Sequence, residues 1–321
     1  MTSDLSTTAF VGYLAATTQR QRLRAHSLDW LGAGLGASML VMWIGAVFLD
    51  PASEREDGDG SRPTPHSADA TTPETVVAGY VGAAHTHASD IRFLAPGSTD
   101  LTVHGVDWMG RPFKSPIYYG ARAIRWHGTG ATGTMLDFTH SKAIAPPGQT
   151  VRLSGSRNGR AAPETGRTGD LFKHLEFSHG HNMLTLNRLL RVGLPTARVA
   201  PYLGAGAGVN LPHTEIQFLD ETERTYEYQY TGPTGQVLVG VELRLPRLSL
   251  FVEYKLSVSH YAAPLTGRDN KASFGYSDFF VQLAGWWRGE KPKHGMATTW
   301  LVSHNVVGGA GARIGADAAA R

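Results

Sequence analysis

The sequence predicts an all-β protein built on an eight-stranded antiparallel β-barrel of the outer-membrane type, with long extracellular loops and short periplasmic turns. Two observations predict this class. Residues 236–245 and 250–259 alternate with the period of two that is typical of strands, and one face of each segment is entirely apolar. The opposite face carries Glu242, Arg244, Glu253 and Lys255. A soluble sandwich would hide its apolar face, whereas a membrane barrel turns that face to lipid and encloses the charges.

The composition agrees with a β-rich barrel and argues against several other classes. The chain has 321 residues with 38 Gly and 0 Cys, which favours β-structure and excludes disulfides and thiolate metal sites. The formal net charge is only +3, and no dense Lys/Arg stretch with interleaved aromatics occurs, so no nucleic-acid partner is expected. The mean hydropathy of -0.20 is too polar for a helical membrane protein but is typical of barrels with polar interiors.

Residues 1–52 are expected to direct the chain out of the cytoplasm. A polar region with three arginines precedes an uncharged run at residues 30–49, which is long enough to span a bilayer. This order is typical of a signal peptide, and an uncleaved inner-membrane anchor helix has the same features. Residues 53–73 contain acidic residues, Pro, Ser and Thr without apolar periodicity, and are predicted to be a disordered linker.

The barrel is predicted over residues 74–288, where eight alternating segments each reach the roughly 9–11 residues that a tilted membrane strand requires. The segments are 75–87, 117–126, 133–142, 182–192, 199–210, 234–245, 249–260 and 277–288. Long connections alternate with short ones, which are residues 127–132, 193–198 and 246–248. The last segment contains Phe279, Phe280, Trp286 and Trp287, which would form an interfacial aromatic girdle. Residues 289–321 are predicted to be a flexible tail.

The inward faces of these strands carry charged residues of both signs. They are Arg122, Asp137, Glu242, Arg244, Glu253 and Lys255. Because an eight-stranded barrel is filled by its own side chains, these residues are interpreted as a buried, self-paired network that fixes strand register. The run Gly204, Gly206 and Gly208 has the wrong spacing for nucleotide binding and lies within a strand, so close packing explains it and no flavin or NAD site is predicted.

Histidines gather at the predicted outer ends of the strands. They are His85, His87, His140, His179, His181, His213 and His260, with Asp90, Glu176, Lys142 and Glu215 in the same layer. Residues on loops that a rigid barrel holds in place are often functional, and this rim would lie level with lipopolysaccharide in the outer leaflet. The alternative is that the rim residues simply contact lipid phosphates and sugars.

Three kinds of chemistry are considered for the rim residues. A divalent metal ion could be bound by the His/carboxylate set of His87, Asp90, His140 and His213. A hydrolase could use Ser178 and His179 with Glu176, although adjacent residues of an extended chain face opposite sides. Nucleotide binding is disfavoured by the glycine spacing described above.

Short polar motifs are spread over residues 74–288, many of them at strand ends where packing does not require them. They include Thr-His-Ala-Ser-Asp at 86–90, Asp-Phe-Thr-His-Ser-Lys at 137–142 and the segments 99–102, 184–187, 201–206, 212–213, 231–233 and 251–255. With these motifs the chain resembles the outer-membrane lipid A oxidases of Gram-negative bacteria.

The resemblance implies an oxidoreductase that converts the proximal glucosamine of lipid A to 2-aminogluconate, with molecular oxygen as co-substrate and a divalent metal ion of unspecified identity. The residues carried over as catalytic are His87, Ser89, Asp90, His140 and Lys142, and His213 joins the metal set above. The expected partner is lipid A or whole lipopolysaccharide, at the outer membrane, and a monomer is expected.

Some features depart from this pattern. The segment Phe-Ser-His-Gly-His at 177–181 is unusually rich in histidine, and the long N-terminal region and tail are also uncommon. Two alternatives therefore stay open. One is a lipid A deacylase that uses Ser178 and His179, and the other is a non-enzymatic OmpA-like or OmpW-like barrel with a structural or adhesive role.

Overall fold

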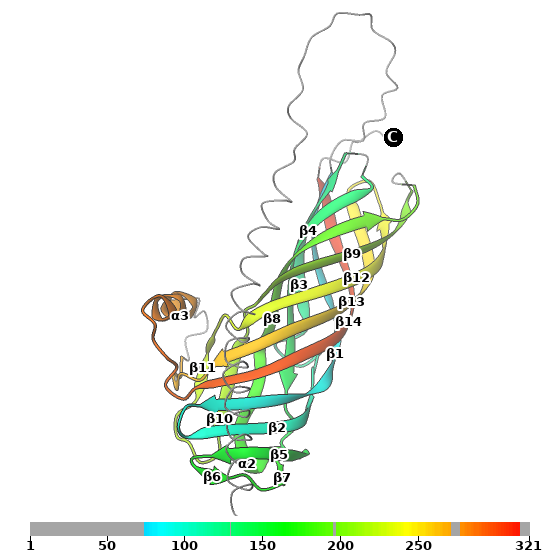
Figure 1. Cartoon of the computed structure of the whole chain (residues 1–321). Coiled ribbons are helices and arrows are strands. Elements are labelled where there is room, and N and C mark those ends of the chain that lie inside the picture. Colours follow the sequence, from blue (N-terminus) through cyan, green and yellow to red (C-terminus); the bar gives the residue numbers. More distant parts are fainter. Residues whose placement is uncertain (1–73, 129, 195–196, 271–276, 315–321) are drawn as a thin grey trace, which may run out of the picture. The chain divides into compact units, whose positions relative to one another are not determined.

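The structure is a computed structural model that describes residues 74–128, 130–194, 197–270 and 277–314 (Figure 1). The predictions for the leader at residues 1–52, with its apolar run at 30–49, and for the linker at 53–73 lie outside the described residues. The same holds for the last seven residues of the predicted tail, 315–321.

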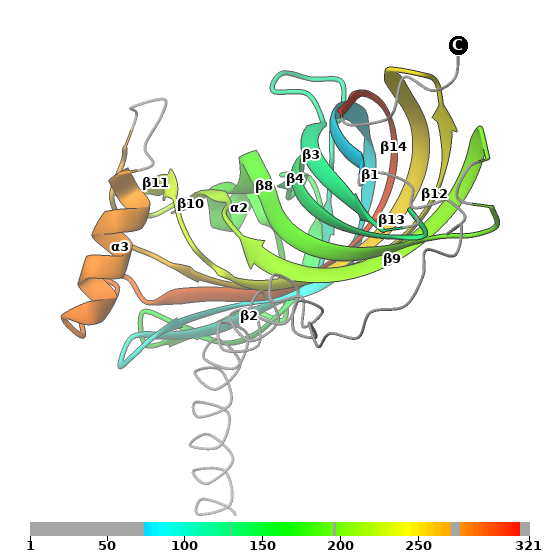
Figure 2. The ribbon, with the colours of Figure 1, turned by 90° about the horizontal axis from the view of Figure 1, so that it is seen from above.

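Eight long antiparallel strands close on themselves into a barrel, as Figures 1 and 2 show. These wall strands are β1 (Glu74–Ala95), β3 (Tyr119–His127), β4 (Thr132–Ile144), β8 (Phe172–Arg191), β9 (Val199–Asn210), β12 (Gly232–Arg244), β13 (Leu248–Pro264) and β14 (Met296–Ile314). They pair in the order β1-β3-β4-β8-β9-β12-β13-β14, and β14 pairs again with β1. The predicted eight-stranded antiparallel architecture is therefore confirmed.

The position of the eighth strand was wrong in the sequence prediction. The segment predicted as the eighth strand, residues 277–288, is instead the helix α3 (Ser277–Trp287). The barrel is closed by β14, which lies within the segment predicted to be a flexible tail. The buried residues of α3 are Asp278, Gln282 and Gly285, at helical spacing. Gln282 exchanges two hydrogen bonds with the backbone of Tyr230, at 2.7 and 2.8 Å, so the polar face of the helix covers this part of the chain. Neither described helix combines the length and hydropathy needed to cross a membrane.

The predicted long loops are largely β-structure that continues the wall strands outward. They contain β2 (Thr99–Trp108), β5 (Thr150–Arg157), β6 (Arg160–Ala161), β7 (Thr165–Arg167), the short helix α2 (Thr168–Leu171), β10 (His213–Phe218) and β11 (Thr225–Tyr228). β2 and β5 extend the sheet from β1, whereas β10 and β11 extend it from the first half of β8. An apolar core that includes Phe93, Trp108, Phe177 and Tyr261 lies among these extensions. We call this region the outer lobe.

The outside of the barrel wall is apolar. Exposed side chains on it include Val77, Val81, Leu136, Leu190, Leu203, Val237, Val239, Val241, Leu250, Val252 and Val306. Val239 is 54% exposed and Val252 is 65% exposed. Their inward neighbours include both apolar residues, such as Leu238 beside Val239, and charged ones, such as Glu253 beside Val252. The charges of the wall are therefore enclosed while its exposed face is apolar, which is the reverse of a soluble sandwich, as the alternation predicted.

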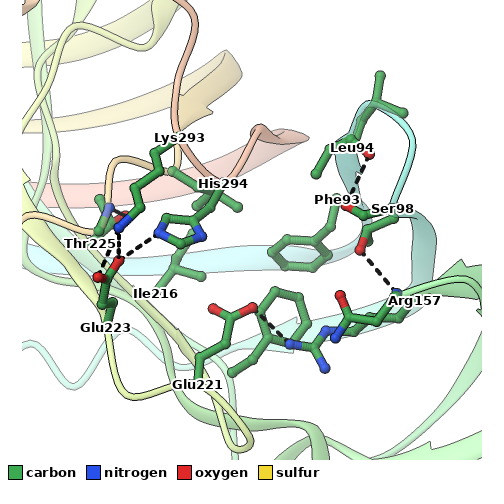
Figure 3. A pocket seen from close by; sticks show the side chains of 16 residues that line it. Phe93, Leu94, Ser98, Arg157, Ile216, Glu221, Glu223, Thr225, Lys293 and His294 are labelled. Atoms are coloured by element: carbon green, nitrogen blue, oxygen red, sulfur yellow. Dashed lines mark hydrogen bonds and ion pairs between the residues drawn. The ribbon is translucent and has the colours of Figure 1, made fainter.

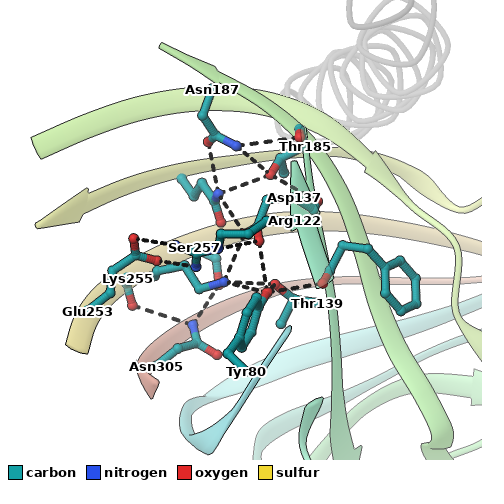
Figure 4. Close-up of polar contacts among 12 residues, drawn as sticks. Tyr80, Arg122, Asp137, Thr139, Thr185, Asn187, Glu253, Lys255, Ser257 and Asn305 are labelled. Atoms are coloured by element: carbon teal, nitrogen blue, oxygen red, sulfur yellow. Dashed lines mark hydrogen bonds and ion pairs between the residues drawn. The ribbon is translucent and has the colours of Figure 1, made fainter. Parts of the chain in front are cut away.

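The inside of the barrel holds a network of fully buried charges (Figure 4). Arg122 donates two hydrogen bonds to Glu253, at 2.9 and 2.7 Å, and Lys255 Nζ donates to Asp137 at 2.9 Å. Tyr202 donates to the same Glu253 at 2.7 Å. Two cations thus face two carboxylates, which offsets much of the desolvation cost of burying each charge.

A second group of charges lies at the end of the lumen with the short turns. Arg191 contacts Glu242 at 2.9 Å, and Arg244 contacts Glu74 at 3.1 Å. Arg313 of β14 also binds Glu74. The lumen residues predicted from the sequence therefore lie in two paired clusters, and Arg191, Arg313 and Glu74 complete the second one.

The glycines of β9 make room for this interior. Gly204, Gly206 and Gly208 lie on its inward face, between Tyr202 and Asn210. A Cβ atom at Gly206 would lie 2.3 Å from both Asn187 Oδ1 and the Leu186 carbonyl oxygen, which is closer than non-bonded atoms approach. The stripe therefore serves close packing.

Replacing Gly206 with Val is expected to destabilise the barrel by about 1–3 kcal/mol, because the backbone of β8 must move away. Urea unfolding of the protein in detergent micelles, followed by Trp fluorescence, measures the change. Ala205→Val is the matched control, since Ala205 is exposed on the outward face of the same strand. Equal unfolding midpoints for the two variants would contradict the packing role.

Candidate functional site

A cluster of histidines and carboxylates lies on the outward faces of β8 and β10, where β8 extends beyond the barrel wall and pairs with β10. We call it the rim cluster, and it consists of His174, Glu176, His179, His213 and Glu215. On β8, Leu175 and Phe177 point into the core of the outer lobe, so Glu176 between them points the other way. Glu176 and Glu215 are direct cross-strand partners in the antiparallel register.

Three of these residues have the spacing of metal ligands. His174 Nδ1 lies 3.2 Å from Glu176 Oε1 and 3.3 Å from Glu215 Oε1. Within the described parts of the chain, this is the one group of three His, Asp or Glu residues whose ligand atoms all lie within 4.8 Å of one another. Ligands at about 2.0–2.2 Å from one tetrahedral ion would lie about 3.3–3.6 Å apart. An imidazole and two carboxylates suit a divalent transition-metal ion.

The electrostatics of the cluster favour a cation. Burial raises the pKa of Glu215, and the neighbouring Glu176 carboxylate raises it further, while His174 and Arg224 act in the opposite direction. Arg224 donates to Glu215 Oε1 at 2.9 Å and also binds Asp269. One guanidinium therefore serves two carboxylates, and a divalent cation would stabilise the ionised form of Glu215.

Two further imidazoles extend the donor set. The ring of His213 lies 5.1 Å from the ring of His179 and 4.3 Å from that of Tyr226, measured between centroids. His213 Nδ1 is buried and has no hydrogen-bond partner among the described residues. Burial lowers the pKa of His213 to about 4, with a smaller contribution from His179, so the ring is neutral at pH 7. A neutral ring with an unused nitrogen can act as a ligand or a base.

His140 lies beside the cluster on the outward face of β4. Its Nδ1 is 2.8 Å from Asn182 Oδ1, and the Asn182 amide donates to the Leu211 carbonyl at 3.1 Å, which fixes the orientation of the amide. His140 Nδ1 therefore carries the hydrogen, and Nε2 keeps its lone pair. Nε2 is buried without a hydrogen-bond partner in the described structure, and Tyr119 stacks on the ring at 4.6 Å. His140 Nε2 thus has an unused lone pair.

Lys142 provides positive charge next to these groups. Its Nζ donates to the Lys114 carbonyl at 2.7 Å. The ammonium group also interacts electrostatically with the charged side chains of Lys114, Arg111 and Glu176. Lys142 itself is buried, whereas Arg111 and Lys114 in the loop before β3 are exposed, so an anionic ligand near the rim cluster would meet these two side chains first.

The structure brings together only part of the site predicted from the sequence. His140, Lys142 and His213 lie at the rim cluster, whereas His87, Ser89 and Asp90 lie on β1 with other partners. These partners are His304 for His87, Thr299 and Trp108 for Ser89, and His104 and the Gly105 amide for Asp90. The metal set of His87, Asp90, His140 and His213 is not assembled, because no three of its described ligand atoms meet within 4.8 Å.

His174 was missed because it lies in a segment that was predicted to be a loop. The signal that could have found it is the alternation of His174, Glu176 and Ser178, which continues the pattern of the following strand. Glu176, His179 and Glu215 were placed in the rim layer from the sequence.

The geometry at Ser178 does not form a hydrolytic triad. Ser178 Oγ lies 3.3 Å from His179 Nδ1, and Glu215 Oε2 lies 3.7 Å from the same nitrogen. A serine nucleophile and its acidic partner must occupy opposite ring nitrogens of the shared histidine. Here the opposite nitrogen, Nε2, faces the Tyr226 hydroxyl at 3.5 Å.

A small cavity of about 110 Å³ lies elsewhere in the outer lobe (Figure 3). Its charged side chains neutralise one another, because Glu223 binds Lys293 at 2.7 Å and His294 at 2.8 Å. Arg157 likewise binds Glu221 at 2.8 Å. Among the described residues, no three His, Asp or Glu ligand atoms of this cavity meet within 4.8 Å, so the rim cluster is the better candidate for metal chemistry.

Neither the family models nor the curated proteins searched contain a match to this sequence. Among solved structures, the crystal structure of Neisserial surface protein A (NspA) matches 76% of this chain and 96% of its own, with 11% sequence identity and a TM-score of 0.33.

Proposed function

We propose that this chain is an outer-membrane enzyme that oxidises the proximal glucosamine of lipid A with molecular oxygen, using a divalent metal ion bound by the rim cluster. The observation that carries the proposal is the ligand spacing of His174, Glu176 and Glu215 on the outward face, beside the free Nε2 of His140. The motif resemblance to lipid A oxidases supports the choice of substrate.

The outer surface of the wall supports the membrane location. Arg125 and Arg188 point outward near the short turns, where Arg125 bonds Thr75 Oγ1 at 2.9 Å. On β1, residues 75 to 85 rise about 33 Å along the strand, or about 25 Å across a bilayer at the usual tilt, which is the height of the apolar band of such barrels. His85 then begins the next polar level, where phospholipid and lipid A headgroups would lie.

The helix α3 supports the same placement. Its exposed side chains are apolar, and Phe280 and Trp287 are 73% and 93% exposed. Aromatic side chains of this kind are stable at the boundary between headgroups and acyl chains. From the sequence, these aromatic residues are expected to form an interfacial girdle as part of a strand. In the structure they would reach the interface from the helix α3 instead.

Val239→Arg tests whether the wall contacts lipid. The substitution is expected to lower stability in lipid vesicles by about 2–4 kcal/mol, because an arginine near the bilayer midplane must be desolvated. Folding yield and urea unfolding in phospholipid vesicles measure it. Leu219→Arg is the control, since Leu219 is 56% exposed beyond the end of β10 in the outer lobe. A wall that faces water would tolerate both substitutions equally.

The proposed reaction removes a hydride equivalent from C1 of the reducing-end sugar and a proton from its O1 hydroxyl. Molecular oxygen takes the two electrons and two protons and leaves as hydrogen peroxide, while water opens the resulting lactone to the acid. The sugar therefore gains one oxygen atom. His140 Nε2 would accept the O1 proton. The basic side chains of Arg111, Lys114 and Lys142 would bind a lipid A phosphate. A redox-active metal ion would supply the electron transfer to oxygen.

Mass spectrometry of lipid A tests the proposal directly. The chain is expressed in a host that makes lipid A lacking the 1-phosphate, in air and without oxygen, beside a host without the chain. We expect a gain of one oxygen atom that requires both the chain and air. Loss of an acyl chain would identify a deacylase instead, and unchanged lipid A from a folded barrel would support a structural or adhesive role.

A further inference from the structure

We propose that His85, His87 and His304 form a second metal site, on the lipid-facing wall of the barrel and separate from the rim cluster. The site would bind one borderline transition-metal ion such as Zn²⁺, Cu²⁺ or Co²⁺ through three imidazoles. It does not depend on the proposed oxidation of lipid A, because the residues belong to other strands, β1 and β14.

The strand register places the three imidazoles on one face of the sheet. His85 and His304 are direct partners in the antiparallel pairing of β1 with β14, and His87 follows two residues after His85. Between them, Thr86 and Ser303 point inward and share a hydrogen bond of 2.8 Å, which holds the register and directs the histidines outward. Two ligands from alternate positions of one strand and a third from its neighbour can converge on one ion.

The contacts already bring two ligand atoms together. His87 Nε2 and His304 Nε2 are 2.7 Å apart, and His304 Nδ1 is 2.6 Å from the hydroxyl of Tyr254 on β13. When the Tyr254 oxygen accepts the Nδ1 hydrogen, His304 Nε2 keeps a lone pair that faces His87. Outer partners of this kind orient metal-binding histidines and fix their tautomer.

The histidine rings must move before they can hold an ion, because the ligand atoms of His85, His87 and His304 do not all lie within 4.8 Å of one another. Two nitrogens at about 2.0–2.1 Å from a tetrahedral ion would be about 3.3 Å apart, so the His87 and His304 rings must separate slightly. The ring of His85 lies 5.3 Å from that of His87, and its exposed side chain is free to rotate toward them. Three neutral imidazoles leave a fourth position open for water or a lipid headgroup.

The same contacts argue against a site for lipid phosphate. A phosphate would be bound by protonated histidines, but two imidazolium rings cannot place their Nε2 atoms 2.7 Å apart, because both would carry hydrogens and positive charge. At least one of the two rings is therefore neutral, and a metal ion can replace the hydrogen that they share.

Metal titration of the purified full-length protein in detergent micelles tests the site. Glu215→Gln removes a ligand of the rim cluster, and in this background we expect one remaining Zn²⁺ site by calorimetry and a Co²⁺ absorption spectrum typical of nitrogen ligands. His87→Gln and His304→Gln should each weaken Zn²⁺ binding at least about 100-fold, and Tyr254→Phe about tenfold.

His260→Gln is the matched control, because His260 lies on the adjoining strand β13 and its ring packs at a tilt against that of Trp300, with the centroids 4.7 Å apart. It should leave Zn²⁺ affinity unchanged, and gel mobility of unheated samples verifies that each variant is folded. Unchanged affinity in folded His304→Gln, or no binding by Glu215→Gln, would overturn the site. Lipid A oxidation is a separate readout, so failure of that function would leave this result unaffected.

Discussion

Glu253→Leu is expected to destabilise the barrel by about 3–5 kcal/mol, because it leaves the buried guanidinium of Arg122 without its bidentate partner. Both side chains are 0% exposed, so water cannot replace the lost contact. Asp137 lies 3.4 Å from Arg122 Nε but already binds Lys255. In Glu253→Leu, the single carboxylate of Asp137 would therefore have to balance both Arg122 and Lys255. Urea unfolding in detergent micelles measures the change in unfolding free energy.

The double variant Arg122→Met with Glu253→Leu tests the origin of this effect. It removes one charge of each sign and leaves the Lys255–Asp137 pair balanced, so we expect it to be more stable than Glu253→Leu alone. A coupling energy between the two sites of several times the experimental error would follow. If the two substitutions were additive, the charge balance would not be what stabilises the lumen.

Glu215→Gln is expected to reduce lipid A oxidation more than about 100-fold, since losing even an outer partner of a metal ligand often costs 10–100-fold. The amide keeps the size of the side chain but removes the charge that His174 and Arg224 contact. Oxidised lipid A is quantified by mass spectrometry from cells that contain equal amounts of folded protein, with and without added divalent ions.

Glu223→Gln is the matched control for this experiment. Glu223 is a carboxylate of the same outer lobe, paired with Lys293 and His294 and distant in sequence from β8. Oxidation at the level of the unmodified protein is expected for this variant. Full oxidation by folded Glu215→Gln would exclude the rim cluster as the metal site of the reaction, whatever metal the protein contains.

The sequence by itself determined seven of the eight wall strands and the direction of their side chains. The segment 199–210 was predicted with the bounds that β9 has, and Arg122, Asp137, Glu253 and Lys255 were assigned inward as the structure places them. This succeeds because side-chain direction in a strand depends only on local periodicity and on which medium each face contacts.

The eighth strand could not be located by the same means. The aromatic residues between Phe279 and Trp287 imitate a girdle, whereas β14 contains many Gly and Ala residues that give a weak hydrophobic alternation. Only pairing with β1 on one side and β13 on the other reveals that residues 296–314 are needed to close the sheet. Closure is a property of the whole barrel, and no local segment records it.

The two candidate metal sites were also decided by tertiary structure. His140, Lys142 and His213 were placed at the rim from strand ends, but the contact of His174 with Glu215 depends on the pairing of β8 with β10. His87 finds its partner, His304, in a segment that was predicted to be a tail. Periodicity tells which face of a strand a residue occupies. Ligand geometry depends instead on which strands are neighbours and in which register, and both follow only from the pairing of strands across the whole sheet.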